Sequence, residues 1–162
     1  MQIRPATAAD VGAITDIYNQ AVAETTASFD LEPKTLEQRM AWFEGHGPRH
    51  PVFVAEVDDQ IVGWGSLSPY SERPAYDATA EISIYIDHAW RRRGVGAALG
   101  QQLLASARAI GLHAIIARIC TENEASLRMT RNLGFTDAGT LHAVGFKFGR
   151  WLDVAQLELL LS

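Results

Sequence analysis

Cysteine is almost missing from this chain, because Cys120 is the only one among 162 residues. A single cysteine excludes an intrachain disulfide framework and fits a reducing compartment, so the sequence predicts a cytoplasmic protein. Apolar stretches long enough to span a bilayer are missing too, and Met1 to Asp10 lacks the basic start and apolar core of a signal peptide. We therefore expect a protein that is not exported and has no membrane partner.

The chain also lacks a surplus of basic residues. Its formal net charge is -5, which argues against sequence-independent binding to nucleic acid or to an anionic membrane. Hydrophobic residues make up 48% of the chain and charged residues 20%, a composition too apolar for disorder. No repeat or linker interrupts it, so a single domain over residues 1–162 is predicted.

The chain shows no pattern of metal ligands. Its five histidines have no tight metal-ligand spacing with one another or with Cys120, so we predict no metal site. These histidines are His46, His50, His88, His113 and His142. Cys120 itself could be imagined as an acyl-carrying nucleophile, but a lone cysteine at a strand end is usually a small hydrophobe. Covalent catalysis is therefore not expected.

Periodicity and turn residues predict the order β-α-α-β-β-β-α-β-α-β-β. The predicted strands are Gln2–Pro5, Pro51–Val57, Ile61–Leu67, Thr79–Asp87, His113–Ile119, Gly139–Phe146 and Leu152–Leu161. Two strand–helix–strand steps follow Thr79, and they favour an α/β fold whose mixed sheet carries helices on both faces.

Capping signals mark the four predicted helices. The pairs Thr7 with Asp10 and Thr35 with Gln38 open the first two, and Asn123 can cap the last. The third begins at Gly94 and Gly96 and ends at Gly111. In the second helix, three apolar side chains line one side at helical intervals, namely Leu36, Met40 and Phe43.

The strand over Thr79–Asp87 alternates between two kinds of side chain. Ile82, Ile84 and Ile86 fall on one face, and Glu81, Ser83 and Tyr85 fall on the other. The second face is unusually polar for a central strand.

A basic, glycine-containing turn follows that strand, with the sequence Arg91-Arg92-Arg93-Gly94-Val95-Gly96-Ala97. Free backbone amides at a helix start suit a diphosphate, glycines allow close approach, and arginines add charge. A surface loop with solvated arginines is the alternative. A Walker A loop is disfavoured because Ala97 and Ala98 replace its lysine and hydroxyl residue, and a Rossmann turn because the next strand ends in Arg118-Ile119-Cys120 rather than an acid.

The segment Arg91-x-x-Gly94-x-Gly96 resembles motif A of the GCN5-related N-acetyltransferases (GNAT), and Asn123–Ser126 through Leu133-Gly134-Phe135 resembles their motif B. The resemblance implies a mostly antiparallel GNAT fold and acetyl-CoA as co-substrate. The turn amides would hold its pyrophosphate, the strand at Ile84-Tyr85-Ile86 would pair with its pantetheine arm, and Asn123 and Ser126 would touch that arm from the other side. Asn123 can serve as a plain helix cap as well.

Further residues resemble one branch of this family, the phosphinothricin and methionine sulfoximine acetyltransferases. They are Phe29, Tyr76-Asp77-Ala78-Thr79-Ala80-Glu81 and Gly145-Phe146-Lys147-x-Gly149-x-Trp151-x-Asp153. The branch implies N-acetylation of the α-amine of a small amino-acid analogue by a homodimer, with Trp151 near the interface. The implied substrate-binding residues are Phe29, Arg73, Tyr76, Tyr85 and Lys147. For Arg73, a solvated loop position is the alternative.

An amine must be neutral to attack a thioester, so a general base is useful. Glu81 is the candidate, and the matching glutamate of the branch has this role; the alternative is a structural carboxylate bound to an amide or an arginine. Many GNAT proteins carry a tyrosine acid four residues before the Gly-Phe pair of motif B, where this chain has Thr130. No general acid is therefore predicted.

Two other classes of function stay open. One is an acyl-CoA-binding regulator without turnover, against which the intact Glu81 and glycine turn speak. The other is an acetyltransferase of protein N-termini or lysines. The aromatic and basic candidates Phe29, Arg73, Tyr76 and Lys147 instead suggest a compact anionic substrate.

Overall fold

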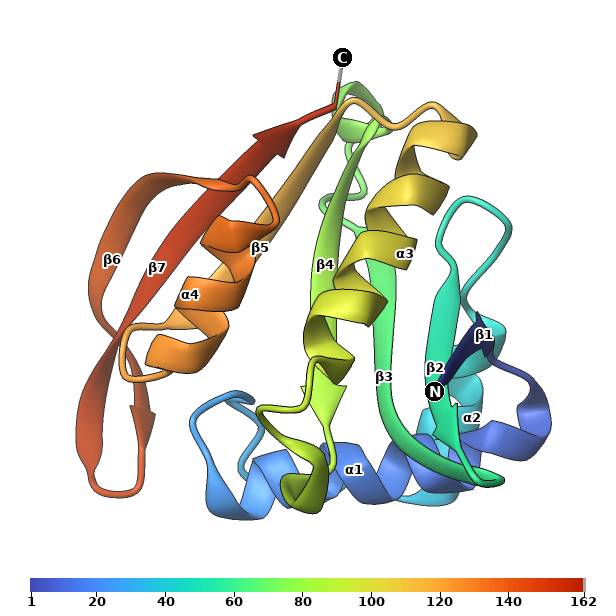
Figure 1. Ribbon diagram of the computed structural model, residues 1–162. Coiled ribbons are helices and arrows are strands. Elements are labelled where there is room, and N and C mark those ends of the chain that lie inside the picture. Colours follow the sequence, from blue (N-terminus) through green and yellow to red (C-terminus); the bar gives the residue numbers. More distant parts are fainter. Residues whose placement is uncertain (162) are drawn as a thin grey trace.

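The computed structural model describes residues 1–161, which form a seven-stranded mixed sheet with four α-helices (Figure 1). The strands are β1 (Gln2–Pro5), β2 (Val52–Val57), β3 (Gln60–Pro69), β4 (Thr79–Ile86), β5 (Ala114–Cys120), β6 (Thr136–Lys147) and β7 (Arg150–Leu160). The helices are α1 (Val11–Glu24), α2 (Leu36–Glu44), α3 (Val95–Ile110) and α4 (Glu124–Asn132). The predicted element order is confirmed, with strand ends shifted by a few residues.

The sheet has the order β1-β2-β3-β4-β5-β7-β6. Every neighbouring pair is antiparallel except β4 and β5, which run parallel. The predicted mixed, mostly antiparallel sheet is therefore confirmed.

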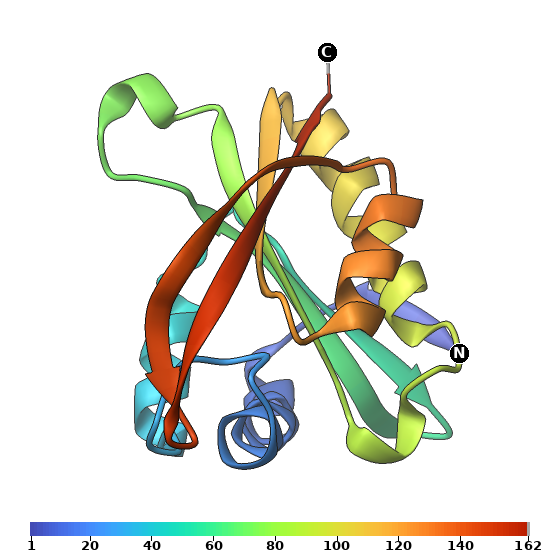
Figure 2. The same cartoon turned by 90° about the vertical axis from the view of Figure 1, so that its left-hand side faces the viewer.

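Helices cover both faces of the sheet, as expected (Figure 2). Alternation along β2 separates the two layers, because Val54 packs with α1 and α2 whereas Phe53 packs with α3. Leu99 and Leu103 of α3 are fully buried on one side, and Ile14 of α1 is fully buried on the other. Within residues 1–161, no helix has the length and apolar character needed to cross a membrane.

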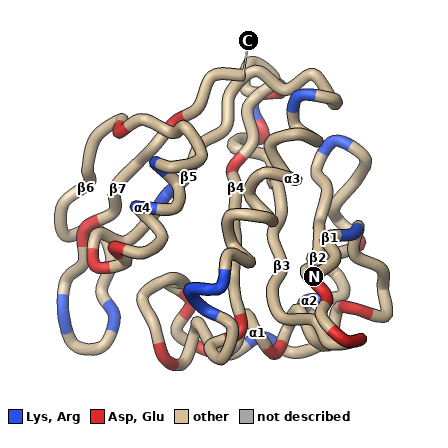
Figure 3. The backbone as a smooth tube through the Cα atoms, in the orientation of Figure 1, with Lys and Arg blue, Asp and Glu red and all other residues tan. Residues whose placement is uncertain are grey.

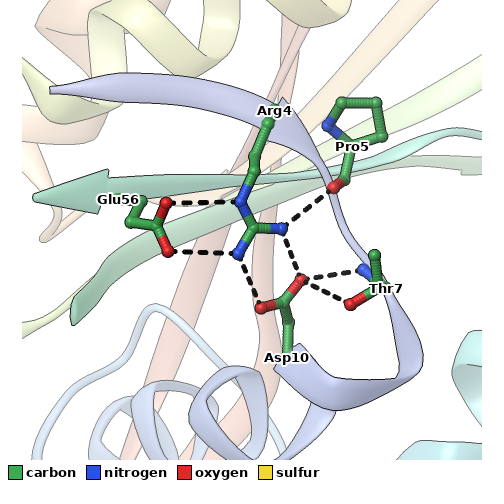
Figure 4. A network of polar contacts seen from close by, with 5 residues as sticks. All are labelled: Arg4, Pro5, Thr7, Asp10 and Glu56. Carbon is green, nitrogen blue, oxygen red and sulfur yellow. Dashed lines mark hydrogen bonds and ion pairs between the residues drawn. The ribbon is translucent and has the colours of Figure 1, made fainter. Parts of the chain in front are cut away.

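A polar network fixes the chain where β1 passes into α1 (Figure 4). Arg4 donates to both carboxylate oxygens of Asp10, at 2.8 and 2.9 Å, and also contacts Glu56 of β2. The backbone N–H of Thr7 donates to Asp10 at 2.8 Å, so Asp10 serves the predicted capping pair as well. Hydrogen bonding from Arg4 lowers the pKa of the Asp10 carboxyl.

Helix α2 begins at the predicted capping box, since the N–H of Gln38 donates to the Thr35 hydroxyl at 3.1 Å. Its buried face differs from a simple apolar row. Leu36 is 55% exposed, while Arg39 is only 6% exposed. The reason lies in the partner surface, where aromatic rings of Tyr18 and Trp64 attract a cation.

The strands β4 and β5 diverge after a short paired segment. They pair only at Thr79↔Ala114, Ala80↔Ile115 and Glu81↔Ile116. Beyond this point β4 stays paired with β3 as far as Ile86, and β5 stays paired with β7 as far as Cys120. A wedge therefore opens between β4 and β5, and within residues 1–161 no strand pairs with the β5-facing edge of β4 beyond Glu81 (Figure 1).

Candidate active site

Side chains from β4, β5 and α4 line a cavity of about 180 Å³ in this wedge. Five residues predicted from the sequence line it, namely Glu81, Ile84, Tyr85, Asn123 and Ser126. Ile86 does not line it and packs against the core under α3. The Oδ1 of Asn123 accepts from the N–H of Ser126 at 3.2 Å, which confirms the helix cap.

The basic turn lies between β4 and the start of α3, where Figure 3 shows a run of Lys and Arg colouring. Gly94 caps the helix in a left-handed conformation with φ of 81°, and a Cβ at this position would meet nothing within 4 Å. The first helical bond runs from the N–H of Ala98 to the carbonyl of Gly94, at 3.1 Å. The three preceding amides, of Val95, Gly96 and Ala97, therefore have no acceptor within the helix.

The two glycines of the turn differ in role. Gly96 is buried, and a Cβ on it would lie 2.6 Å from the sulfur of Met129 in α4. Its missing side chain lets α3 approach α4. The sequence predicts that both glycines allow a ligand to approach closely, but only Gly94 faces open space.

Glu81 lies at the apex of the wedge in an ion pair with Arg118 of β5. Arg118 donates from Nε and Nη2 to the two carboxylate oxygens, both at 2.7 Å. This hydrogen bonding raises the pKa of the Arg118 guanidinium. Glu81 thus combines the two roles considered for it, since it lines the cavity and is bound to an arginine. Sequence reasoning missed Arg118, which only the register Glu81↔Ile116 brings within reach.

A second cavity, of about 600 Å³, lies on the α1 and α2 side of the sheet. Ser83 and Tyr85 line both cavities, so the two meet across β4. The predicted polar face of β4 continues onto β3, because the cross-strand pairs are Ser68↔Glu81, Ser66↔Ser83 and Trp64↔Tyr85. Such opposed pairs share one face of the sheet.

His46 approaches this polar face from the end of α2. Its Nδ1 lies 2.8 Å from the carbonyl of Trp42, so Nδ1 carries the proton and donates. Its Nε2, 3.2 Å from the Ser68 hydroxyl, then accepts when the ring is neutral. Burial lowers the pKa of His46, which favours that neutral form.

Tyr85 fixes the wall between the cavities. Its ring stacks on Trp64, with centroids 5.0 Å apart, and its hydroxyl donates to the carbonyl of Ala27 at 3.3 Å. Burial raises the pKa of the Tyr85 phenol, so this hydroxyl stays protonated at neutral pH.

The predicted substrate-binding residues separate into two groups. Phe29 lies against Gly145 of β6, and Lys147 donates from Nζ to the carbonyl of Ser28 at 2.6 Å. Together with Tyr85 they tie the loop after α1 to the wedge and to the β6–β7 hairpin. Arg73 and Tyr76 lie apart in the exposed loop before β4, and neither lines either cavity.

Two further residues considered from the sequence, Thr130 and Cys120, are buried and line the wedge cavity. Thr130 thus occupies the wall at the position where the sequence resemblance expects a tyrosine. Across residues 1–161, no group of three or more His, Cys, Asp and Glu side chains could hold a metal ion.

Comparison with known proteins supplies the family. The model of the acetyltransferase (GNAT) family matches residues 14–135. A phosphinothricin N-acetyltransferase of Streptomyces viridochromogenes is 40% identical over 154 residues, covering 95% of this chain and 84% of that protein. An L-methionine sulfoximine/L-methionine sulfone acetyltransferase of Salmonella typhimurium is 37% identical over 163 residues, covering 100% of this chain and 95% of that protein.

A solved structure agrees with these sequence matches. It is a GNAT superfamily phosphinothricin acetyltransferase from Sinorhizobium meliloti in complex with acetyl-CoA, and it superposes with a TM-score of 0.97 at 33% identity. The match covers 99% of this chain and 88% of that one. The resemblance drawn from the sequence is confirmed: this chain belongs to the GNAT acetyltransferase family, as an N-acetyltransferase that uses acetyl-CoA and is close to the phosphinothricin and methionine sulfoximine/sulfone acetyltransferases.

Proposed function

We propose that this enzyme acetylates the α-amine of a small amino-acid analogue such as phosphinothricin, methionine sulfoximine or methionine sulfone. The observation that carries the proposal is the meeting of two cavities across Ser83 and Tyr85, beside the carboxylate of Glu81. The wedge cavity suits the acetyl donor, and the second cavity suits a compact acceptor. The acceptors after which the two relatives are named support this choice.

The wedge fits acetyl-CoA, which supplies the acetyl group as a thioester. The amides of Val95, Gly96 and Ala97 would hold the pyrophosphate, and Arg91, Arg92 and Arg93 would add positive charge. The unpaired edge of β4 at Ile84–Ile86 would bond the pantetheine arm as a further strand does. Asn123 and Ser126 would contact that arm from α4.

In this proposal Glu81 accepts the proton of the acceptor amine, directly or through one water molecule. Arg118 holds the carboxylate by two 2.7 Å hydrogen bonds, so the carboxylate needs no reorientation before the proton transfer. Tyr85 keeps its proton and forms the wall against which the acceptor lies.

A panel of amines tests the acceptor class. We expect acetyl-CoA consumption with the three oxidised analogues to show a higher kcat/KM than with unoxidised methionine, peptide amines or polyamines. The thioester assay reads every amine in the same way. Faster acetylation of peptides or polyamines would contradict the proposed acceptor, and tight acetyl-CoA binding without turnover of any amine would indicate a regulator instead.

We further propose that the enzyme is a homodimer joined through the β6–β7 hairpin. This hairpin forms a sheet edge and exposes large apolar side chains, with Phe146 54%, Phe148 50% and Trp151 66% exposed. Patches of this kind mark protein contacts.

Light scattering at assay concentrations should give the mass of a dimer, and Trp151→Glu should shift the measured mass towards that of the monomer. Gln101→Glu, which adds the same charge at an exposed position of α3, is the control. A monomeric wild type would contradict the proposal.

A further inference from the structure

The second cavity contains a buried cation that has no hydrogen-bond partner. Arg39 of α2 is 6% exposed, and its Nε and Nη2 have no acceptor among residues 1–161. The guanidinium carbon lies 3.8 Å from the centroid of the Trp42 ring and 4.4 Å from that of Tyr18. Aromatic faces attract the charge, but they leave the N–H groups without oxygen acceptors. Buried N–H groups of a charged side chain are costly to leave unpaired, so this arrangement indicates a ligand.

Other donors lie around the same cavity. The indole Nε1 of Trp64 is also buried without a partner among the described residues. The charged residues that line the cavity are Arg39, Lys34 and Asp30. Asp30 accepts from the Tyr18 hydroxyl and lies 3.9 Å from the Nζ of Lys34, so its carboxylate is already engaged. The cavity is therefore net positive and rich in donors, which suits an oxygen-bearing group.

The position of Arg39 along the sheet indicates which end of the acceptor it can bind. Arg39 stacks near Trp64, its guanidinium carbon 5.1 Å from that ring centroid, and Trp64 pairs across the sheet with Tyr85. Four residues of strand, roughly 13 Å, separate Tyr85 from Glu81. Arg39 therefore lies toward the Tyr85 end of β4, and an acceptor whose amine is beside Glu81 or its water would turn its distal end, rather than its α-carboxylate, toward Arg39. The distal end of the side chain extends further.

We propose that Arg39, with the indole N–H of Trp64, binds the oxidised tip of the acceptor side chain, the oxygens of a phosphinate, sulfone or sulfoximine. This inference rests on the proposed function and adds to it the group that distinguishes these acceptors from methionine. A planar guanidinium suits two oxygens on one tetrahedral centre. The aromatic rings around Arg39 hold it in place before the acceptor arrives.

The test compares Arg39→Met with Lys34→Met, which removes the other cation of the cavity. Arg39→Met should lower kcat/KM for methionine sulfone roughly 10- to 100-fold and leave that for unoxidised methionine nearly unchanged. Lys34→Met should leave the ratio of the two acceptors as in the wild type. Arg39→Lys keeps the charge without the fork and should recover part of the preference, which also serves if Arg39→Met does not fold.

Two results would overturn the inference. An equal loss for both acceptors would make Arg39 a structural residue only. The second result concerns methionine and the derivative in which an amide replaces its α-carboxylate. If Arg39→Met loses the preference for methionine over this amide but keeps the preference for the sulfone, Arg39 binds the α-carboxylate instead.

Calorimetry separates this inference from the proposed function. Methionine sulfone is titrated into coenzyme A-loaded wild type and into the Arg39 variants, so no turnover is needed. A wild type that binds the sulfone through Arg39 but acetylates no analogue would reject the proposed function and keep the subsite. Equal affinity in wild type and Arg39→Met, or no binding to wild type, would reject the subsite.

Discussion

Glu81→Gln is expected to lower turnover by roughly a hundredfold or more, because general base catalysis typically contributes that much. Glutamine keeps the shape of the side chain and removes the proton acceptor. Acetyl-CoA affinity, measured by calorimetry, should stay close to that of the wild type because the proposed pyrophosphate donors lie at the start of α3.

The ion pair with Arg118 supplies the matched control. Arg118→Gln removes the guanidinium that makes the two 2.7 Å hydrogen bonds but leaves the carboxylate in the wedge. We expect it to retain turnover within roughly tenfold of the wild type, as a positioning residue does. If both variants lose turnover equally, the ion pair and not the base explains the effect. Wild-type turnover in Glu81→Gln would move the base elsewhere, with His46 beside the Ser68 hydroxyl as the next candidate.

Local signals in the sequence were sufficient for most of the fold. Capping at Thr35 and Asn123 and the left-handed glycines at Gly94 and Gly111 mark helix ends, because they act within one turn of chain. Alternation along β4 separates Ile84 from its polar neighbours for the same reason. These features need no knowledge of distant partners.

The parts that were missed depend on contacts between distant segments. Arg118 meets Glu81 only because β4 and β5 run parallel for three residue pairs and then diverge. Arg39 is buried because rings from α1, α2 and β3 surround it, whereas the pattern of α2 alone favours Leu36, Met40 and Phe43 as the packed row. Periodicity describes one element and does not describe the surface that the element meets.

The predicted site shows the same division. Most residues predicted on β4 and at the start of α4 line the wedge cavity, since their own strand and helix place them there, and Ile86 is the exception. Arg73 and Tyr76 are close to Glu81 in the sequence, but their loop runs outside both cavities. The second cavity is lined by residues of α1, α2, β3 and β4, so no single sequence motif predicts it.

The second large effect is expected from Ala97→Pro, which should weaken acetyl-CoA binding roughly 10- to 100-fold. Ala97 is the third residue of α3, and its N–H precedes the first helical bond, so proline removes a free donor and no helical bond. Gly96 before it has no Cβ to clash with the proline ring, and the carbonyl four residues earlier belongs to Arg93, outside the helix. The thermal midpoint should therefore stay near the wild-type value.

This substitution tests the turn more cleanly than a bulky residue at Gly96, which would collide with Met129 and disturb the packing of α3 on α4. Ala97→Ser is the control, because it alters the side chain and keeps the N–H. Calorimetry should give it an affinity close to that of the wild type. A hydrogen bond to a charged acceptor is worth about 1.5–3 kcal/mol, and the expected loss corresponds to one such bond. If Ala97→Pro binds acetyl-CoA as tightly as Ala97→Ser, that amide does not hold the pyrophosphate.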